Sequence, residues 1–542
     1  MCLIAIDIWK KLVHNIIRQK CVPVFRAHRE LYSERTVNVR EYYPINKDVS
    51  YIDNPYFKEN TFHDVHTEEL PEYEKIKHLL PKPIWDGHET ELECYNFAWK
   101  TAFKNIKNPS AESGFVSPFI DTAFNGDLFM WDSSFILMFC KYASHIFNFQ
   151  QTLDNFYAKQ HRDGYICRQL NEKNGGDAYS RFDPASTGPN IMPWCEWEFF
   201  RQSGDKGRLE KIFPCLLAYH EWLKENHTWR DGSYWSSGFG CGMDNINSRL
   251  PEGVNPKFSH GHMVWVDTNM QQVLSGELLV KMAKILGRGG EKAVAEIAEE
   301  SEYLKKYINN NLWDEKSAYY YDLRRDGSLN YSKHIGAYWA LISGVVPKER
   351  LCAFVSHLDN PDEFKRPHRV PTVSADDPFY CETGNYWNGS VWAPTNYMVL
   401  RGLEKYGYEE LAYDIAVNHI GAVTEVYRDT KTVWENYAPE LIEKGGSSKA
   451  DFVGWTGLVP ISVMIEYVLG IRAAAGENKL TWHINRTERH GVEHYPVGNG
   501  KFADLVCDAR KSADEKPCVH IKSQKNIEVG IFWNGKSEII KA

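Results

Sequence analysis

The sequence lacks the features of a membrane protein, a secreted protein and a nucleotide-binding protein. No apolar run among its 542 residues is long enough to span a bilayer, and the N-terminal stretch places its apolar residues before its lysines, the reverse of a signal peptide. The chain contains no G-x-G-x-x-G, P-loop or Ser-His-Asp signature. We therefore expect a cytoplasmic protein with no cofactor and no membrane partner.

The cysteines and histidines lack the spacing of a disulfide framework or a metal site. Twelve cysteines are scattered from Cys2 to Cys518 without a C-x-x-C pair, which is typical of free thiols in a reducing compartment. His260 and His262 have H-x-H spacing, but no third ligand is evident near them. The sequence therefore predicts no bound metal.

The chain also lacks an excess of basic residues. Its 63 Lys and Arg residues against 72 Asp and Glu residues give a net charge of −9, which argues against a nucleic acid or an anionic membrane as partner. By contrast, 18 Trp and 30 Tyr residues are many for this length, and 43% hydrophobic content is ample for a core. A small neutral ligand such as a carbohydrate remains favoured.

From about residue 118 to residue 471 the sequence reads as amphipathic helices separated by long polar and aromatic loops. In one segment Trp131, Phe135, Met138, Tyr142 and Phe149 fall on one helical face. The other predicted helices are Pro193–Ser203, Arg208–Glu225, a segment from Asp267 as N-cap to Gly287 as stop, Ala293–Leu312, His334–Ser343, Val391–Tyr406, Glu409–Tyr427 and Thr456–Leu469. Such a succession suggests a closed ring of helix pairs or an open solenoid, and the absence of a fixed repeat favours the ring.

The organisation predicted from these patterns has three parts. Residues 1–85 are charged and poorly periodic, so we expect an N-terminal arm or cap. Residues 86–475 are predicted to form an all-α domain of paired helices. Residues 476–542 contain short alternating runs and are predicted to form a small β-rich C-terminal unit.

The stretch from Tyr386 to Met398 interleaves aromatic rings with amides, glycine and proline. Its tryptophans do not follow the period of a buried strand or helix. A sugar ring has an apolar face that stacks on aromatic rings and a hydroxyl edge that needs fixed donors and acceptors. This stretch is therefore a candidate wall of a sugar site.

Two acids lie in loops that suit glycosidic bond hydrolysis, which requires one carboxylic acid and one carboxylate. Asp244 follows a Gly-rich turn that would allow close backbone approach, and Glu435 lies between Trp434 and Asn436, where apolar walls could tune its pKa. For each acid taken alone, a helix cap or a solvated loop residue is the plainer reading. Asp376 and Asp377 could supply the acid instead, but adjacent residues on an extended chain point in opposite directions.

Four motifs occur in order along the chain: "GMDN", "WNGSVWAP", "WENY" and "GWTGLVP". Together they resemble the helical-barrel glycosidases of glycoside hydrolase family 63, which include processing α-glucosidase I and the bacterial mannosylglycerate and glucosylglycerate hydrolases, with trehalase more distant. The resemblance covers approximately residues 110 to 472.

The resemblance implies roles for individual residues. Asp244 matches the family's general acid and Glu435 its general base, in an inverting mechanism. Residues of these loops, and of the loop "MWDSSF", which matches the family's W-D loop, are expected to bind the sugar: Trp131, Asp132, Trp387, Asn388, Gly389, Trp392, Trp434, Tyr437 and Trp455. The resemblance also implies that residues 86–475 form the catalytic domain, an (α/α)6 barrel of six helical hairpins.

We therefore predict an inverting exo-α-glycosidase of the α-glucosidase type, acting on short oligosaccharides or small glycosides. Two alternatives remain open. A helical-barrel epimerase or isomerase would convert a free monosaccharide, using histidines for proton transfer. A catalytically silent sugar-binding protein would bind sugars without turnover, because aromatic pockets bind sugars without chemistry.

Overall fold

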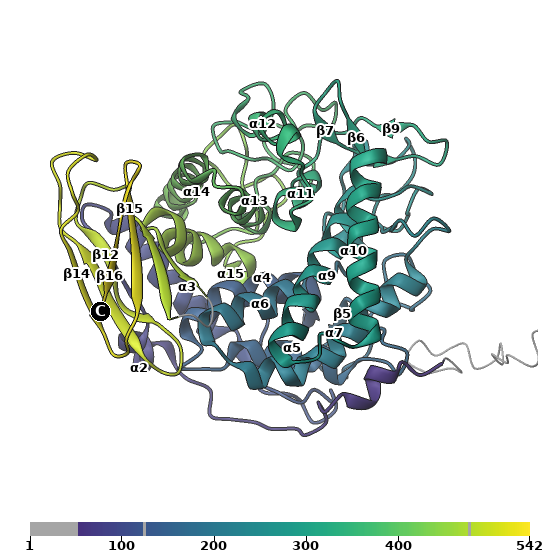
Figure 1. The fold of residues 1–542 in the computed structure, drawn as a ribbon, viewed down its shortest axis with the longest axis horizontal. Coiled ribbons are helices and arrows are strands. Elements are labelled where there is room, and N and C mark those ends of the chain that lie inside the picture. The colour runs from purple at the N-terminus through teal and green to yellow at the C-terminus, as the bar shows by residue number, and fades with distance from the viewer. Residues whose placement is uncertain (1–51, 123–125, 475–477) are drawn as a thin grey trace, which may run out of the picture. The chain divides into compact units, whose positions relative to one another are not determined.

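The computed structural model describes residues 52–122, 126–474 and 478–542, and residues 54–542 form one unit by their contacts. Most of the predicted N-terminal arm, residues 1–51, lies outside the described residues. Helices make up most of the part between residues 89 and 468 (Figure 1). The longer helices are α3 Glu89–Lys104, α4 Met130–Cys140, α5 Thr152–Ala158, α6 Met192–Ser203, α7 Lys206–Asn226, α9 Val266–Leu286, α10 Lys292–Asn311, α12 Lys348–Ser356, α13 Ala393–Lys405 and α14 Glu409–Thr430, together with η8, a π-helix at Leu458–Val468.

Burial divides these helices into two kinds. Every residue of α4 and of η8 is buried, so neither helix has a solvent-exposed face. In α10 the buried residues instead form one stripe, with Val294, Ile297, Ser301, Leu304 and Ile308 at spacings of three and four. Helices of the first kind lie inside the molecule, and helices of the second kind cover them.

Contacts between helices run in a cycle. Helix α4 contacts α6, α6 contacts α9, α9 contacts the short helix α11 (Trp339–Ser343), α11 contacts α13, α13 contacts η8, and η8 contacts α4 again. Helices α7, α10, α14 and α3 pack against members of this cycle, and α9 and α10 lie side by side in Figure 1. The fold is thus helix-rich, as predicted.

Local sequence signals explain several helix ends and miss others. Gly287 ends α9 in the left-handed conformation, as predicted from the sequence. The prediction of Asp267 as N-cap was wrong, because α9 begins at Val266 and Asp267 lies in its first turn, where it binds an arginine. The helix predicted through Phe149 also ends early, since α4 stops at Cys140 and a 3-10 turn follows at Lys141–Ala143.

Two four-stranded sheets lie at one side of the helices (Figure 1). One has the order β1-β12-β13-β14 (Lys82–Trp85, His490–Pro496, Phe502–Cys507, Val519–Ser523), and the other β10-β11-β15-β16 (Ile471–Ala474, Lys479–His483, Glu528–Trp533, Lys536–Lys541). Strand β1 pairs antiparallel with β12, so residues just before α3 join the C-terminal strands. The β region therefore includes residues outside the predicted range 476–542.

Four short two-stranded antiparallel sheets lie among the helices of the described residues. They are β2-β3 (Ile106–Lys107, Phe119–Ile120), β4-β5 (Asp127–Phe129, Gln169–Asn171), β6-β7 (Trp313–Asp314, Tyr319–Tyr320) and β8-β9 (Asp322–Leu323, Leu329–Asn330). Strand β4 leads directly into α4 and so fixes the start of that helix. The short helices α2 (Tyr73–Ile76), α8 (Gly238–Cys241) and α15 (Val453–Thr456) lie in the loops.

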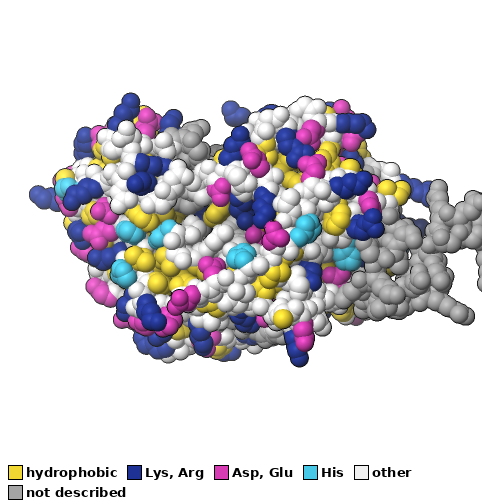
Figure 2. Space-filling model, turned by 90° about the horizontal axis from the view of Figure 1, so that it is seen from below, with side chains coloured by type: hydrophobic (Ala, Val, Ile, Leu, Met, Phe, Trp, Pro, Cys, Tyr) yellow, Lys and Arg dark blue, Asp and Glu magenta, His cyan; other side chains and the backbone are white. Residues whose placement is uncertain are grey.

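The described surface carries charges of both signs. On the face shown in Figure 2, Lys and Arg side chains alternate with Asp and Glu side chains among the described residues. The ten cysteines within the described ranges are free. In that part of the chain, no helix combines the length and the apolar composition needed to cross a bilayer.

Two helical glycines provide a matched test of the packing between α11 and α13. A Cβ on Gly402 would lie 2.6 Å from Leu341 Cβ, whereas a Cβ on Gly421 of α14 would meet no atom within 4 Å. We expect Gly402→Ala to lower the free energy of unfolding by about 1–3 kcal/mol through overpacking, and Gly421→Ala to raise it by about 0.4–1 kcal/mol. Chemical denaturation of both variants measures this, and equal effects would contradict the close approach of α11 and α13.

Candidate active site

Loops at the N-terminal ends of several helices enclose a cavity of about 290 Å³. Five of the predicted site residues line it: Trp131, Asp132, Asp244, Trp387 and Trp455. Trp131 and Asp132 lie in the first turn of α4, Trp387 precedes α13, and Trp455 belongs to α15. Residues separated by more than 300 positions in the sequence thus meet around one space.

A glycine turn brings the loop of Asp244 against the wall of the cavity. Gly242 has φ +80°, and a Cβ there would lie 2.6 Å from the Trp131 ring. The backbone can pass so close to the indole only because residue 242 has no side chain. Asp244, two residues further on, is therefore held beside Trp131.

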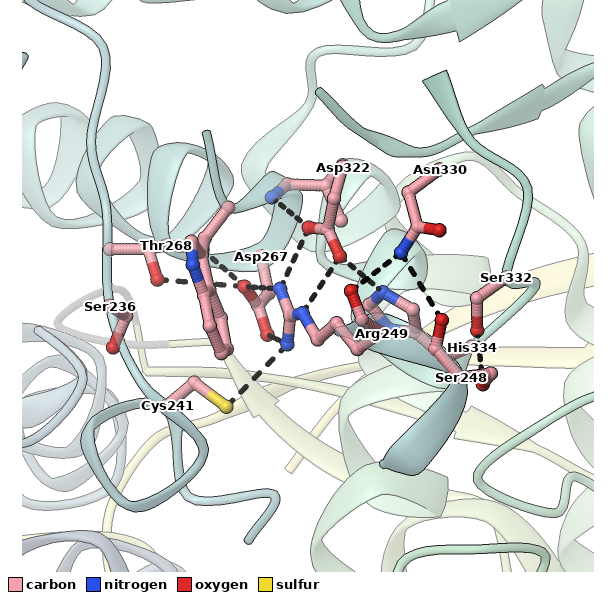
Figure 3. A network of polar contacts seen from close by, with 12 residues as sticks. Ser236, Cys241, Ser248, Arg249, Asp267, Thr268, Asp322, Asn330, Ser332 and His334 are labelled. Carbon is pink, nitrogen blue, oxygen red and sulfur yellow. Dashed lines mark hydrogen bonds and ion pairs between the residues drawn. The ribbon is translucent and has the colours of Figure 1, made fainter. Parts of the chain in front are cut away.

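Arg249 anchors the other end of the same loop (Figure 3). Its guanidinium donates to both carboxylate oxygens of Asp267, at 2.8 and 2.6 Å, and to both oxygens of Asp322, at 2.8 and 2.9 Å. The guanidinium carbon lies 3.7 Å from the centre of the Trp265 ring, and His334 Nε2 lies 3.3 Å from Asp322. All these residues are buried, and the cation holds the pKa of Asp322 well below its usual range.

Glu435 lies behind the cavity wall and is only 3% exposed. Its backbone N–H donates to Lys449 O at 2.9 Å, and its carbonyl oxygen accepts from Trp455 Nε1 at 2.8 Å. The Tyr386 hydroxyl, on a residue that lines the cavity, donates to Glu435 Oε1 at 3.2 Å. The carboxylate therefore faces the cavity region through Tyr386.

Burial raises the pKa values of three carboxyl groups in this region. The pKa of Asp244 is about 6, and the positive charges of Arg168 and Lys257 partly oppose the rise. Burial raises the pKa of Glu435 to about 7, with the Tyr386 hydrogen bond opposing and the Asp244 charge adding. The pKa of Asp132 is raised well above its usual value, by burial first and then by the charges of Glu435 and Asp244. The ionisation of these groups is therefore linked, because the charge of one raises the pKa of another.

The tryptophans form a stacked wall. The Trp387 and Trp392 rings are parallel, with centroids 3.9 Å apart and planes at 4°, and Trp455 packs against Trp392 at 5.4 Å. One face of Trp387 is thus covered by Trp392, and Trp387 is 1% exposed. Its remaining contribution to a ligand is the part of the ring that lines the cavity.

The other predicted binding residues do not line the cavity. Asn388 links its loop to the loop of Asp244, since Asn388 Oδ1 accepts from Asn247 N at 3.0 Å. Gly389 permits a close approach within its own loop, where a Cβ on it would lie 2.9 Å from Cys381 O. The remaining three support the wall from behind: Trp392, Trp434 and Tyr437. The Tyr437 hydroxyl, for example, accepts from the backbone N–H of Trp434 at 3.1 Å.

Two cations that lower the pKa of Asp244 were not anticipated from the sequence: Arg168, which lines the cavity, and Lys257, which lies outside its lining. The Arg168 guanidinium carbon lies 4.4 Å from the Tyr179 ring and 4.6 Å from the Phe239 ring, and Arg168 Nε donates to Ala185 O at 2.8 Å. Lys257 Nζ lies 5.3 Å from the Phe239 ring. These residues come from separate loops without a shared motif, so no sequence signal linked them to Asp244.

Within the described ranges, one group of side chains has metal-ligand chemistry: Asp508, Cys518 and His520. It lies in the C-terminal β region, partly exposed, and His520 Nε2 already lies 2.8 Å from Asp508 Oδ2. The pKa of the Cys518 thiol is raised by Asp508, which disfavours the thiolate that binds metals. His260 and His262 do not belong to this group.

Two carboxyl groups from separate loops, both with raised pKa values, thus lie beside a cavity walled by aromatic rings, and hydrolysis of a glycosidic bond requires two such groups. Residues 128–452, more than half of the chain, match the family model of the mannosylglycerate hydrolase MGH1-like glycoside hydrolase domain. The chain belongs to this family and is a glycoside hydrolase. The resemblance inferred from the motifs is thereby confirmed.

Relatives with assigned names agree with the family. The chain is 23% identical over 346 residues to mannosylglycerate hydrolase from Thermus thermophilus, covering 52% of this chain and 83% of the relative. It is 20% identical over 297 residues to mannosyl-oligosaccharide glucosidase from Saccharomyces cerevisiae, covering 46% of this chain and 34% of the relative. The chain thus spans about a third of the yeast glucosidase.

A solved structure has the same fold. The glycoside hydrolase family 63 mannosylglycerate hydrolase from Thermus thermophilus in complex with glucose matches with a TM-score of 0.55 at 18% sequence identity. The match covers 68% of this chain and 99% of that chain. It supports the helix-rich fold described above.

The Arg249 anchor generates a stability prediction. Arg249→Leu would leave Asp267 and Asp322 buried without their cation, so we expect the free energy of unfolding to fall by about 3–5 kcal/mol. Arg428 is exposed and, among the described residues, pairs with neighbours on its own helix, so Arg428→Leu should change the free energy of unfolding by less than about 0.5 kcal/mol. Thermal and denaturant unfolding compare the two variants. Similar stability of both would show that the buried charges have found other partners.

Proposed function

We propose that the chain is an inverting exo-α-glycosidase of the α-glucosidase type that acts on short oligosaccharides or small glycosides. The observation that carries the proposal is the pairing of Asp244 and Glu435, buried acids from separate loops whose pKa values are both raised, with the charge of Asp244 adding to the rise at Glu435. Asp244 protonates the glycosidic oxygen, and Glu435 takes a proton from the water that attacks the opposite face of the sugar. The two carboxyl groups would stand roughly 6.5–9.5 Å apart, which leaves room for that water.

The proposed scaffold is an (α/α)6 barrel. The cycle of contacts through α4, α6, α9, α11, α13 and η8 supports six inner helices, with helices such as α7, α10 and α14 as outer partners. We propose residues 86–475 as the catalytic domain, preceded by the arm of residues 1–85 and followed by the β-rich unit of residues 476–542. In this arrangement the loops at one end of the inner helices carry the chemistry.

The sugar occupies the cavity between Trp131, Asp132, Trp387 and Trp455. The aromatic rings contact its apolar face, and Asp132, whose pKa is raised by burial, forms a hydrogen bond with a hydroxyl. Asn388, Gly389, Trp392, Trp434 and Tyr437 shape the two loops behind this subsite.

The aglycone lies on the side of Asp244, because the acid must reach the glycosidic oxygen. Arg168 and Lys257 are close enough to lower the pKa of Asp244, and Arg168 also lines the cavity. A cation there suits an aglycone with a carboxylate, such as the glycerate in the substrate that names mannosylglycerate hydrolase. We therefore propose small α-glycosides with an acidic aglycone as preferred substrates.

Carboxamide variants separate the roles of the two acids. Asp244→Asn and Glu435→Gln should each lower kcat for an unactivated α-glycoside by about 10²- to 10⁴-fold, because neither amide exchanges the catalytic proton. On an α-glycosyl fluoride, whose leaving group needs no proton, Asp244→Asn should recover most of its rate and Glu435→Gln should not.

Steady-state kinetics on the two substrate types measures this, and unchanged thermal unfolding controls for folding. Recovery by Glu435→Gln rather than Asp244→Asn would reverse the assignment. Conversion of a free monosaccharide by the wild-type protein would favour an epimerase or isomerase. Calorimetric sugar binding without turnover on any α-glycoside would favour a silent binding protein.

A matched pair of substrates tests the aglycone. α-Glucosylglycerate and α-glucosylglycerol differ in a carboxylate against a hydroxymethyl group. We expect kcat/KM to favour the glycerate glycoside by about 10- to 100-fold, and Arg168→Gln to abolish this preference while retaining activity on the glycerol glycoside. Equal loss on both substrates would show that Arg168 acts on Asp244 rather than on the aglycone.

A further inference from the structure

Asn245, the residue after the proposed acid, bridges two peptide units of a loop 140 residues away. Its Oδ1 accepts from Trp387 N at 2.8 Å, and its Nδ2 donates to Asn385 O at 3.4 Å. These two backbone groups flank Tyr386 on either side. One amide side chain therefore fixes the backbone on both sides of Tyr386.

Tyr386 has a backbone conformation that a bulky side chain adopts rarely. Its φ is +56°, in the left-handed region, which is a genuine outlier for an aromatic residue. The Trp392 indole packs edge-to-face against the Tyr386 ring, with centroids 5.0 Å apart, and Trp392 Nε1 donates to Tyr386 O at 3.3 Å. The conformation directs the phenol so that its hydroxyl donates to Glu435 Oε1 at 3.2 Å.

We propose that Asn245 and Tyr386 form a positioning strap that links the loop of the acid, Asp244, to the carboxylate of the base, Glu435. The strap sets where the base stands relative to the acid and stabilises its ionised form. This inference rests on the proposed function, since it takes Asp244 and Glu435 as the catalytic pair. Neither Asn245 nor Tyr386 exchanges a proton in the reaction.

The hydroxyl of Tyr386 can serve as a donor throughout the working pH range. Burial, followed by the charges of the nearby acids, raises the pKa of this phenol, so it stays protonated. A donor to the ionised form of a carboxyl group lowers the pKa of that group, and Tyr386 acts on Glu435 in this direction. The titratable and charged groups that act on Tyr386 and Glu435 are Asp132, Asp244 and Lys449, and Arg168 acts in turn on Asp132 and Asp244.

The pKa values determine which part of the pH profile the strap controls. The active form has Asp244 protonated and Glu435 ionised, although Asp244 has the lower pKa, about 6 against about 7. The profile of kcat/KM should therefore rise near pH 6 and fall near pH 7. Its height should reflect the small fraction of the singly protonated enzyme in which Asp244 carries the proton. If the pKa of Glu435 alone is raised, the form with Asp244 protonated and Glu435 ionised becomes rarer. The last proton is then lost at a higher pH.

Tyr386→Phe tests the strap because it removes the hydroxyl and keeps the ring. We expect the alkaline limb of the kcat/KM profile to move up by about one pH unit, the acid limb to stay, and the plateau to fall about tenfold. Asn245→Ala should move the same limb in the same direction. In the double variant the limb should move no further than in Tyr386→Phe, since both changes remove one contact.

Ser248→Ala is the matched control. Ser248 lies on the same loop as Asn245 but its hydroxyl pairs with Ser332 at 2.6 Å, so the pH profile should not move. A lower plateau with both limbs unmoved in Tyr386→Phe would overturn the strap, because it indicates structural damage alone. So would additive limb shifts in the double variant. Failure of the proposed function is distinguishable, because Glu435→Gln would then remain active.

Discussion

The site depends on the buried bidentate ion pairs that Arg249 forms with Asp267 and Asp322. They join three parts of the chain: the end of the Asp244 loop, the first turn of α9 and the strand β8. A buried guanidinium is stable only when its donors are satisfied, and here two carboxylates and the Trp265 ring surround it. Because the pairing tolerates little movement, it fixes one end of the Asp244 loop against the helices.

Close contacts link the loop that Arg249 holds to the other loops of the site. Gly242 lets the same loop pass against Trp131, and Asn247 N donates to Asn388 Oδ1. The loops that carry the acid and the aromatic wall are thus one connected body. Burial raises the pKa values of Asp244 and Glu435 to about 6 and about 7, so the packing that holds these two carboxyl groups also brings their titration close to neutral pH.

Local patterns predicted the helical region and the ends that glycine determines, such as Gly287. The motifs predicted the family and placed five residues that line one cavity. The prediction from local patterns failed at Asp267. An acid at the start of a helix is typical of a cap, but this carboxylate accepts hydrogen bonds from the buried Arg249 instead. Arg168 and the contacts of Asn245 were not predicted, because they join loops up to 142 residues apart and depend on tertiary structure alone.

The central claim is that Asp244 and Glu435 act together in a single displacement. Proton NMR of a freshly hydrolysed α-glycoside, recorded before mutarotation mixes the anomers, tests it most directly. If Glu435 activates water, the β-anomer of the sugar must appear first. Initial release of the α-anomer would mean that a second displacement follows the first and that Glu435 attacks the sugar carbon itself.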